Sequence, residues 1–506
     1  MAIHSKFFIK DITNEFFEQY KELFFRITEY LDTDTNSKNI LGSAGTDIPR
    51  FTNKLLRQIV FLYFLQKKGW LGVHKNEKWG SGQKNFLQSI FKKSDSEGKN
   101  FFNSYLRFLF YEAFAHQHGE DNYYEKLDCR IPFLNNGLFE ADYDWENFEI
   151  NLPNTLFHNN EKLIKTGDVG TGILDIFNRY IFTIREDEQL EKEVSIDPEM
   201  LGKVFENMLE ITERKSKGAF YTPREIVHYM CQESLVEYLA TSCNQISRDI
   251  IERLIKKQLD QKDADLVKQH VAEIYDALEK VKICDPAIGS GAFSMGMLQE
   301  IFSIKQTLHL FEYGSLDTFR ASEVKLNIIQ NSIYGVDIEK DAVEIARLRL
   351  WLSLIIDEEL PKPLPNLDYK IVEGNSLVSK FEDEVIDIDW SFDVVSQDLF
   401  GTELEKNRIK LLKDISEKQK IFFSPKCNKK QLSLEIRNLK IDLLINWKQH
   451  IQKLQNLKNH PEQPLRFFDW KINFPEIMNP MLAQKMVGIN GTQWYSFTKR
   501  LSCYLR

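Results

Sequence analysis

The sequence predicts an α/β core preceded by a mostly α-helical domain. Three short apolar segments indicate the strands of the core, at residues 281–284, 332–337 and 369–375, and helix-forming sequence follows the first two. Residues 1–195 indicate the helical domain, because they are rich in Phe and Tyr and include a helical stretch at residues 55–71 that is apolar nearly all round, which predicts a buried helix. Strands that alternate with helices are typical of parallel sheets, so we expect an α/β fold for the core.

Length and composition indicate an ordinary globular chain with more than one domain. The chain has 506 residues, of which 42% are hydrophobic and 28% charged, and it is too long for a single core. Changes in pattern predict four segments: residues 1–195, 196–400, 401–460 and 461–506. We expect a helical domain, the α/β core, a basic helical insertion and a short C-terminal part, in that order.

Neither the N-terminus nor the cysteines indicate export from the cell. No apolar stretch approaches the roughly 18–20 residues of a membrane helix, and the acidic N-terminus lacks the apolar core of a cleavable signal. The six cysteines are scattered and include no Cys-x-x-Cys pair. Such cysteines are typical of free thiols in cytoplasmic proteins, so we expect that location and no metal site.

The most informative motif is Asp-Pro-Ala-Ile-Gly-Ser-Gly-Ala-Phe at residues 285–293, between the first predicted strand and a predicted helix over 293–301. Glycines in such a loop let the backbone approach a cofactor closely. Alone, the loop is also compatible with a nicotinamide or flavin site. A site of that kind would require a third glycine at position 294, which is Ser294, so the sequence disfavours it.

Polar residues end the other two predicted strands. Asp337 ends the second strand, where a carboxylate can accept hydrogen bonds from two ribose hydroxyls. Asn375 ends the third, where its side chain suits an adenine amino group. Taken singly, Asp337 could be a surface acid and Asn375 a turn residue. Their occurrence at successive strand ends favours a nucleotide-bearing cofactor.

With the upstream Gly-Ala-Phe-Tyr-Thr-Pro at residues 218–223, these motifs make the segment from about residue 201 to 377 resemble the cofactor half of adenine-N6 DNA methyltransferases. The nearest resemblance is to the fused Type IIG restriction–modification enzymes. It implies a Rossmann-like core that binds S-adenosyl-L-methionine, and double-stranded DNA as the partner. The cofactor residues that it implies are Phe220, Tyr221, Thr222 and Pro223 at the methionine end, then Asp285, Pro286, Gly289, Ser290, Gly291 and Phe293, with Asp337 at the ribose and Asn375 at the adenine. At the adenine position, Asp is the commoner family residue.

In the predicted insertion at residues 401–460 we expect two helices, broken near residue 424, with apolar residues such as Leu412 and Ile415 spaced along one face. The insertion is basic, although the whole chain has a formal charge of −9. It contains 14 Lys and Arg against 6 Asp and Glu, a local charge of +8, which leaves −17 for the rest. Phosphate binding depends on local patches rather than on net charge. The insertion is therefore either a DNA-binding surface or simply a solvated, lysine-rich helical surface.

The resemblance also implies a nuclease that this sequence does not carry. In that family the nuclease binds magnesium through Pro-Asp followed by Glu-x-Lys, and it precedes a helical connector. This chain begins in the connector, and it contains no Pro-Asp dipeptide. We therefore expect no endonuclease activity from this polypeptide, and any cutting would need a separate subunit.

The family's methyl-acceptor motif, Asn/Asp-Pro-Pro-Tyr/Phe, is also missing from the 506 residues. Its polar atoms accept the hydrogens of the target amine, and its ring stacks on the flipped base. Residues 392–400 and 479–482 match it only partly. Residues 467–477 resemble the stretch that leads into the motif, and the resemblance stops near Gly491. We therefore assign no catalytic residue.

These observations predict a broken gene, in which a frameshift or early stop leaves an inactive amino-terminal fragment, or a chain that needs a downstream polypeptide. Two alternatives stay open. The first is a non-catalytic DNA-binding or assembly subunit that keeps the cofactor fold. The second is a methyltransferase of RNA or protein, since only the acceptor motif and a recognition domain would distinguish these classes.

Overall fold

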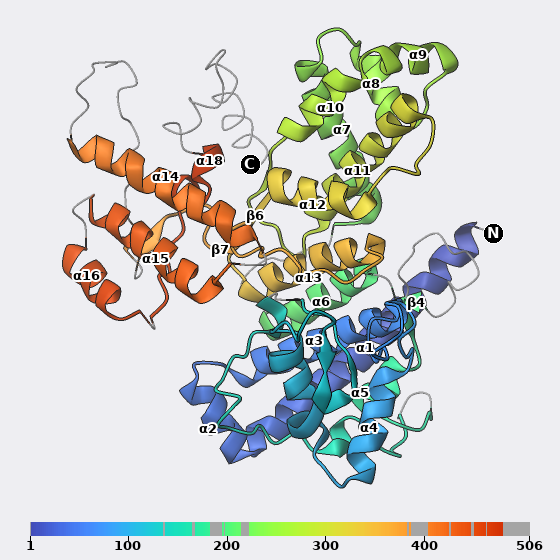
Figure 1. Ribbon diagram of the computed structural model, residues 1–506, viewed down its shortest axis with the longest axis vertical. Helices are drawn as coiled ribbons and strands as arrows, with labels where there is room; N and C mark the ends of the chain where they lie inside the picture. Colours follow the sequence, from blue (N-terminus) through green and yellow to red (C-terminus); the bar gives the residue numbers. More distant parts are fainter. Residues whose placement is uncertain are drawn as a thin grey trace. The chain divides into compact units, whose positions relative to one another are not determined.

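The computed structural model describes residues 2–134, 137–163, 167–182, 195–196, 198–213, 222–381, 384–385, 403–424, 427–446, 450–461 and 463–478. The chain divides into two compact units (Figure 1). The first comprises residues 1–333 and 340–365, and the second comprises residues 334–339 and 366–506. The predicted segment boundaries at residues 195, 400 and 460 stay predictions.

The first unit is mainly helical. Its α-helices are α1 (Ala2–Thr33), α2 (Thr35–Ser43), α3 (Ile48–Lys68), α4 (Phe86–Ser96), α5 (Ile173–Phe177), α6 (Pro198–Glu213), α7 (Arg224–Ser242), α8 (Arg248–Ile255), α9 (Gln261–Gln269), α10 (Val271–Lys280), α11 (Ala292–Tyr313), α12 (Ala321–Ser332) and α13 (Lys340–Asp357). The 3-10 and π-helical turns lie at Phe102–Leu106, Leu109–Ala113, Glu125–Leu127, Gly137–Phe139 and Asn154–Leu156. The strands β1 (Tyr123–Tyr124) and β2 (Cys129–Arg130) pair antiparallel, β3 (Ile181–Phe182) and β4 (Ser195–Ile196) pair in parallel, and β5 spans Ile283–Asp285.

Helix α3 confirms the predicted buried helix, because its residues from Phe51 to Gln66 are all buried. The Asp47 side chain caps its first turn by accepting from the Arg50 N–H at 2.8 Å. The helix ends at Lys68, three residues before the predicted end at Leu71. The reason is Gly69, which ends the helix in a left-handed conformation (φ +74°). Glycine adopts this conformation readily, whereas other residues do not.

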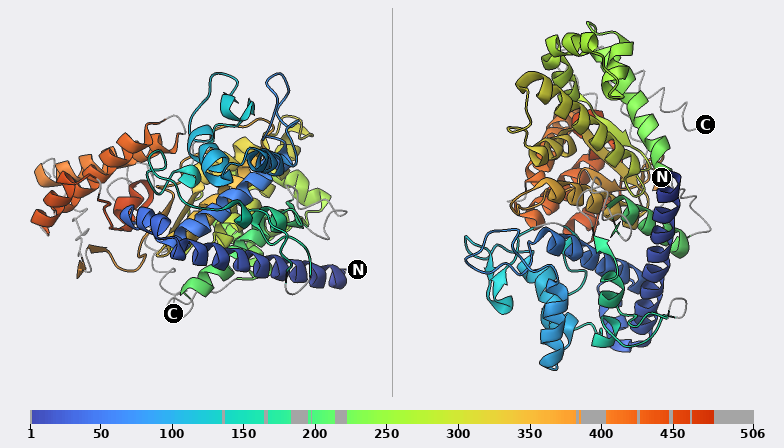
Figure 2. Two further views of the ribbon diagram at one scale, coloured as in Figure 1. Left: turned by 90° about the horizontal axis from the view of Figure 1, so that it is seen from below. Right: turned by 90° about the vertical axis from the view of Figure 1, so that its right-hand side faces the viewer.

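Within the first unit, α3 is attached to α13 by a buried ion-pair cluster. The Arg57 guanidinium lies 3.2 Å from the Asp341 carboxylate and 2.5 Å from that of Glu344. Burial raises the pKa of Glu344, but the nearby cations, Arg57 first, more than offset it, so that the pKa is lowered overall. Figure 2 shows the neighbouring helices α1 and α3, in blue. Helix α13 contacts both α3 and α6, so these helices pack together within the first unit.

The second unit combines a parallel strand pair with a helical insertion. Its elements are β6 (Ile333–Asp337), β7 (Ile371–Glu373), β8 (Lys380–Phe381), β9 (Glu384–Val385), α14 (Glu403–Phe423), α15 (Lys429–Ile445), α16 (Ile451–Asn459), α17 (Trp470–Asn473) and α18 (Pro475–Met478). β6 and β7 are parallel, whereas β8 and β9 form an antiparallel hairpin. Helices α14 and α15 lie side by side (Figure 1).

The insertion has its own apolar core, in which Leu412 and Ile415 of α14 pack with Ile441 and Leu444 of α15 and Leu454 of α16. The sequence predicted two helices broken near residue 424, and the first break is confirmed. The prediction of two helices is wrong, because the described residues contain a third helix, α16. It begins after His450, a non-glycine residue in the left-handed region (φ +51°), which makes the chain change direction.

Two simpler predictions can also be checked. The five cysteines among the described residues, Cys129, Cys231, Cys243, Cys284 and Cys427, are free thiols, as predicted. Within the described ranges, no helix combines the length and apolarity that crossing a membrane would require.

Candidate functional site: a glycine loop and two strand ends

The glycine motif forms a tight loop between β5 and α11. β5 ends at Asp285, whose Oδ1 accepts from the Ala287 N–H at 3.1 Å. Gly289 and Gly291 both have positive φ, +52° and +85°, which other residues adopt only at a cost. Gly291 is also the N-cap of α11 and carries no side chain, so the loop brings bare backbone to a helix N-terminus. Such a terminus favours negatively charged ligand groups.

Helix α13 holds this loop from behind. A Cβ at Gly291 would lie 3.1 Å from the Cβ of Ala346, so glycine is required by close packing as well as by φ. The buried Arg349 donates from Nη1 to the Ser290 carbonyl oxygen at 3.0 Å and to Ser290 Oγ at 3.2 Å. A Cβ at Gly202 of α6 would meet the same guanidinium at 2.8 Å. The loop, α6 and α13 therefore fit one another closely.

Helix α7 follows the Phe-Tyr-Thr-Pro motif in the sequence, and it packs against α11, which follows the glycine loop. Helix α7 begins directly after Pro223, and it packs so closely on α11 that a Cβ at Gly296 would meet Val227 at 2.8 Å. The Cys231 thiol donates to the carbonyl oxygen of Phe293 at 3.7 Å. Thr222 is half-buried and Pro223 exposed.

A polar cluster reinforces the contact between α7 and α11. Glu300 of α11 is buried, and its carboxylate lies 2.5 Å from Nδ1 of His228 and accepts from the Gln232 amide at 3.3 Å. Burial, with the negative charges of Glu300 and Asp285, raises the pKa of the Cys231 thiol to about 12. Cys231 is therefore protonated at neutral pH and serves as a packing residue rather than a nucleophile.

In the second unit, β6 and β7 present the other two predicted residues at their carboxyl ends. Asp337 is the last residue of β6 and lies opposite Glu373 of β7. Its Oδ1 accepts from the Glu339 N–H at 2.9 Å, and its carbonyl oxygen accepts from the Gly374 N–H at 2.8 Å. Asn375 follows shortly after β7. The prediction that both residues lie at neighbouring strand ends is confirmed.

The Asn375 side chain shapes the turn that follows β7. Its Oδ1 accepts from the Leu377 N–H at 2.9 Å and from the Val378 N–H at 3.0 Å. This arrangement is an Asx-type turn, so the turn interpretation of Asn375 is correct as far as it goes. Because Oδ1 already accepts from two N–H groups, the group left for recognition is the Nδ2 donor, which suits a ring nitrogen of a base rather than its amino group.

Several residues that support these strand ends were not predicted. Glu476 of α18 accepts from the hydroxyl of Tyr334, a residue of β6, at 2.7 Å and pairs at 3.2 Å with Lys370, which directly precedes β7. Trp470 and Asp469 contact the turn after β7. The sequence signal for this group is the aromatic and acidic stretch at residues 467–477, which by pattern alone indicates only the approach to the acceptor motif.

Some predicted positions cannot be compared with the structure. Phe220 and Tyr221 lie outside the described residues, as do the two partial acceptor motifs at residues 392–400 and 479–482. Across the ranges that the structure describes, no group of three or more His, Cys, Asp or Glu side chains is placed to hold a metal ion.

Comparisons with known proteins agree with these features. Residues 331–491 match the family model of the Eco57I restriction-modification methylase, and residues 258–383 match that of the MmeI DNA-methyltransferase domain. An assigned type II restriction enzyme and methyltransferase of Methanocaldococcus jannaschii is 29% identical over 423 residues, which is 76% of this chain and 33% of that protein. The chain thus spans about a third of the length of this curated relative.

Among solved structures, the type IIL restriction–modification enzyme MmeI in complex with DNA aligns with 74% of this chain and 40% of its own, at 14% identity and a TM-score of 0.41. The MmeI model spans the glycine loop, Asp337 and Asn375, the Eco57I model spans Asp337 and Asn375, and the resemblance seen in the sequence is confirmed. Residues 258–491 are thus similar to DNA methyltransferases of restriction–modification systems.

Proposed function

We propose that the chain binds S-adenosyl-L-methionine through a Rossmann-like core and belongs to an adenine-N6-specific system acting on double-stranded DNA. The observation that carries this proposal is the pair Asp337 and Asn375, which end neighbouring parallel strands within the matched family region. An acid and an amide at successive strand ends are the groups that a nucleoside needs. When bound, the cofactor supplies the methyl group.

Each motif has a separate task in this proposal. The loop from Asp285 to Phe293 offers backbone N–H groups at the N-terminus of α11, which suit the carboxylate of the cofactor's methionine part. The Phe-Tyr-Thr-Pro motif before α7 lines the same part. Asp337 accepts hydrogen bonds from the ribose hydroxyls, since a carboxylate has room for several donors besides the Glu339 N–H. Asn375 contacts the adenine.

Substitution of the proposed ribose acid tests the cofactor site. Asp337→Ala should weaken binding of S-adenosyl-L-homocysteine by about 10- to 100-fold, because hydrogen bonds to a charged group are removed. Isothermal titration calorimetry measures this change. Asp317→Ala is the matched control, because Asp317 is an exposed carboxylate in the loop before α12. Equal affinity in Asp337→Ala and wild type would show that the strand ends do not bind the cofactor.

We also propose that this polypeptide, by itself, neither transfers methyl groups nor cuts DNA. The reason is chemical: none of the 506 residues forms an Asn-Pro-Pro-Tyr/Phe motif, and no Pro-Asp dipeptide is present for a nuclease. A weakly nucleophilic amine that is not positioned by such a motif will not attack the methyl group. Methylation then requires a further polypeptide that supplies the acceptor site.

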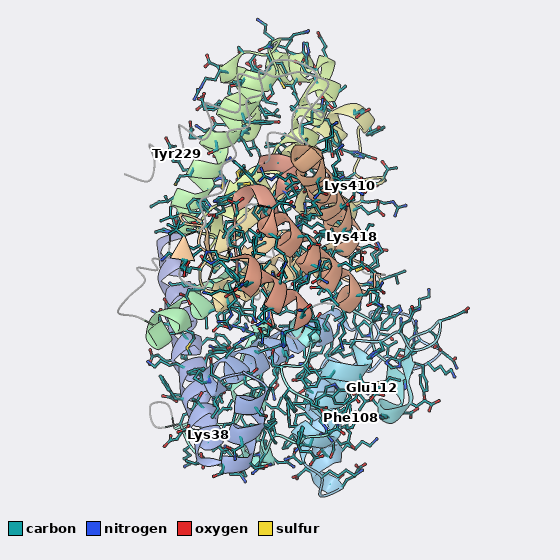
Figure 3. All side chains as sticks on the ribbon, turned by 90° about the vertical axis from the view of Figure 1, so that its left-hand side faces the viewer. Lys38, Phe108, Glu112, Tyr229, Lys410 and Lys418 are labelled. Carbon is teal, nitrogen blue, oxygen red and sulfur yellow. The ribbon has the colours of Figure 1, made fainter. Side chains whose placement is uncertain are left out.

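A second candidate function is a DNA-binding subunit without catalysis, and the surface of α14 favours it. Four exposed lysines recur every three, four or seven residues, which places them on one face of the helix. They are Lys406, Lys410, Lys413 and Lys420. This lysine stripe is the surface that we propose for the DNA backbone. Figure 3 marks Lys410 on α14, with Lys418 on a flank of the same helix, where it pairs with Glu435 at 2.5 Å.

A further inference from the structure

We propose that the segment Phe468–Trp470, here named the clamp, positions the turn at residues 374–379 and so fixes the adenine end of the cofactor site. Asp469 and Trp470 are then positioning residues, which act through Asn375 rather than by touching the ligand. This inference rests on the proposed function, in which Asn375 contacts the adenine.

The turn needs support from outside. Its internal hydrogen bonds, from the Leu377 and Val378 N–H groups to Asn375 Oδ1, shape it locally. However, Leu377 is 80% exposed at its tip, so the turn has little packing of its own. A polar turn of this kind moves on a short timescale unless neighbouring groups hold it.

The clamp meets the turn at three points. The Trp470 indole Nε1 donates to the Ser376 carbonyl oxygen at 2.9 Å, across 94 residues of sequence. The Ser379 hydroxyl donates to Asp469 Oδ2 at 3.2 Å. The Phe468 side chain occupies the space beside Gly374, where a Cβ would come within 2.5 Å of it. These contacts bracket Asn375 on both sides, and a group held at both ends has little freedom to reorient.

The clamp is itself rigid. Asp469 Oδ1 accepts from the N–H groups of Lys471 and Ile472 at 2.9 and 3.1 Å, which caps the short helix α17. The Phe468, Trp470 and Phe474 rings pack against one another with centroids 5.2 to 6.2 Å apart. The carboxylate of Asp469 is largely buried, and burial raises its pKa, with the hydrogen bonds of the cap and of Ser379 opposing the rise.

The clamp is also anchored to the strands that carry the proposed ligand contacts. Phe474 meets the ring of Tyr334 in β6 with centroids 5.3 Å apart. Glu476, two residues further on, accepts hydrogen bonds from Tyr334 of β6 and from Lys370, which directly precedes β7. The clamp therefore takes its position from the same two strands whose ends carry Asp337 and Asn375. The clamp thus holds the proposed adenine contact at a fixed position relative to the proposed ribose contact.

The test uses the full chain and two ligands that differ only at the base edge: S-adenosyl-L-homocysteine and its deaminated analogue, S-inosyl-L-homocysteine. Wild type should prefer the adenosine compound by about tenfold, because the Asn375 Nδ2 donor can pair with N1 of adenine, whereas N1 of hypoxanthine carries a hydrogen and cannot accept. Trp470→Phe keeps an aromatic ring but removes the indole donor. It should reduce that preference by about fivefold, the value of one neutral hydrogen bond. Ser379→Ala should act in the same direction.

Trp351→Phe is the matched control, since the Trp351 indole also donates to a backbone carbonyl, that of Pro365, at 2.9 Å but does not touch the turn. It should leave the preference unchanged even if the protein is less stable. Hydrogen exchange gives a readout without ligand: the Leu377 and Val378 amides should exchange about fivefold faster in Trp470→Phe and at the wild-type rate in Trp351→Phe.

Two results would overturn the inference. In the first, wild type binds S-adenosyl-L-homocysteine, and Trp470→Phe keeps the same base preference and the same exchange rates. This result would exclude a positioning role for the clamp and would leave the proposed function intact. A wild-type protein that does not bind S-adenosyl-L-homocysteine would remove the proposed function and the clamp with it.

Discussion

At the scale of single residues, the chain places charges where burial changes their chemistry. Lys440 of α15 is buried, with its Nζ 5.4 Å from the centre of the Tyr369 ring. Burial lowers its pKa from 10.5 to about 8, against the opposing negative charge of Asp469. A lysine in this environment costs stability while it is charged, so its effect on folding depends on pH.

The stability of the protein should therefore rise between about pH 8 and pH 10.5. In this window the unfolded chain still holds a proton that folded Lys440 has released, so deprotonation favours the folded state. Relative to Lys440→Met, wild type should gain about 3 kcal/mol across the window. Urea midpoints at pH 7.5, 9 and 10.5 measure the gain, and parallel pH profiles for the two proteins would contradict it.

The buried Arg57 makes a second prediction at this scale. Arg57→Met leaves the Asp341 and Glu344 carboxylates without their cation, which should cost about 3 kcal/mol. Neutralising both carboxylates in the triple variant Arg57→Met, Asp341→Asn, Glu344→Gln should restore most of the stability. The thermal midpoint of each variant checks this, and a triple variant no more stable than the single one would contradict it.

How much of the site could be predicted differs from residue to residue. Gly291, Asp337 and Asn375 were predicted because each is required locally, by a backbone angle or by a strand end. Arg349 was not, although an arginine within an apolar helix was visible, because its partners Ser290 and Gly202 are distant in sequence. The hydrogen bond from Trp470 to Ser376 was likewise not predicted, because the two residues are 94 positions apart in the sequence.

At the scale of elements, the apolar periodicity of the insertion predicted which residues are buried but not where every helix begins. The apolar spacing of α14 predicted which residues would be buried, and Leu412 and Ile415 lie in the core. Periodicity did not predict the start of α16 after His450, because a left-handed non-glycine residue has no clear sequence signature. It also cannot say what the exposed face binds, and that question needs an experiment.

The lysine stripe of α14 makes the prediction that belongs to this scale. The double variant Lys410→Glu, Lys413→Glu should weaken binding to duplex DNA and reduce the slope of log affinity against log salt by about 0.9 for each phosphate that is no longer neutralised. Glu417 interrupts the stripe and is exposed, so Glu417→Lys should strengthen binding.

Fluorescence anisotropy across a salt series measures both effects. Lys38→Glu is the control, because Lys38 is an exposed lysine on α2 that pairs with Asp32 at 2.7 Å (labelled in Figure 3). Equal salt slopes in all of these variants would show that the stripe is only a solvated surface.

At the scale of the whole molecule, the sequence predicted strands that alternate with helices and a resemblance to one family, but not the activity. The α/β prediction followed from the alternation, and the resemblance followed from motifs whose spacing is hard to obtain by chance. Activity depends on an acceptor site that no local pattern in this chain supplies. The chain spans about a third of the length of its curated relative.

The purified chain, incubated with tritiated S-adenosyl-L-methionine and unmethylated duplex DNA, should therefore incorporate no label above the level seen without protein. Its cofactor binding, measured in the same preparation, is the control for folding. Label incorporated into adenine would contradict the proposal and would require an acceptor site of a different design.

The fit between Gly202, Arg349 and Ser290 also limits how this protein can be recombined with its relatives. α6 leaves room for a guanidinium that α13 supplies, and the guanidinium in turn holds the glycine loop. A chimaera with a crossover between residues 213 and 340 would set a foreign side chain against one of these three. Viable crossovers must therefore carry α6 and α13 from the same parent.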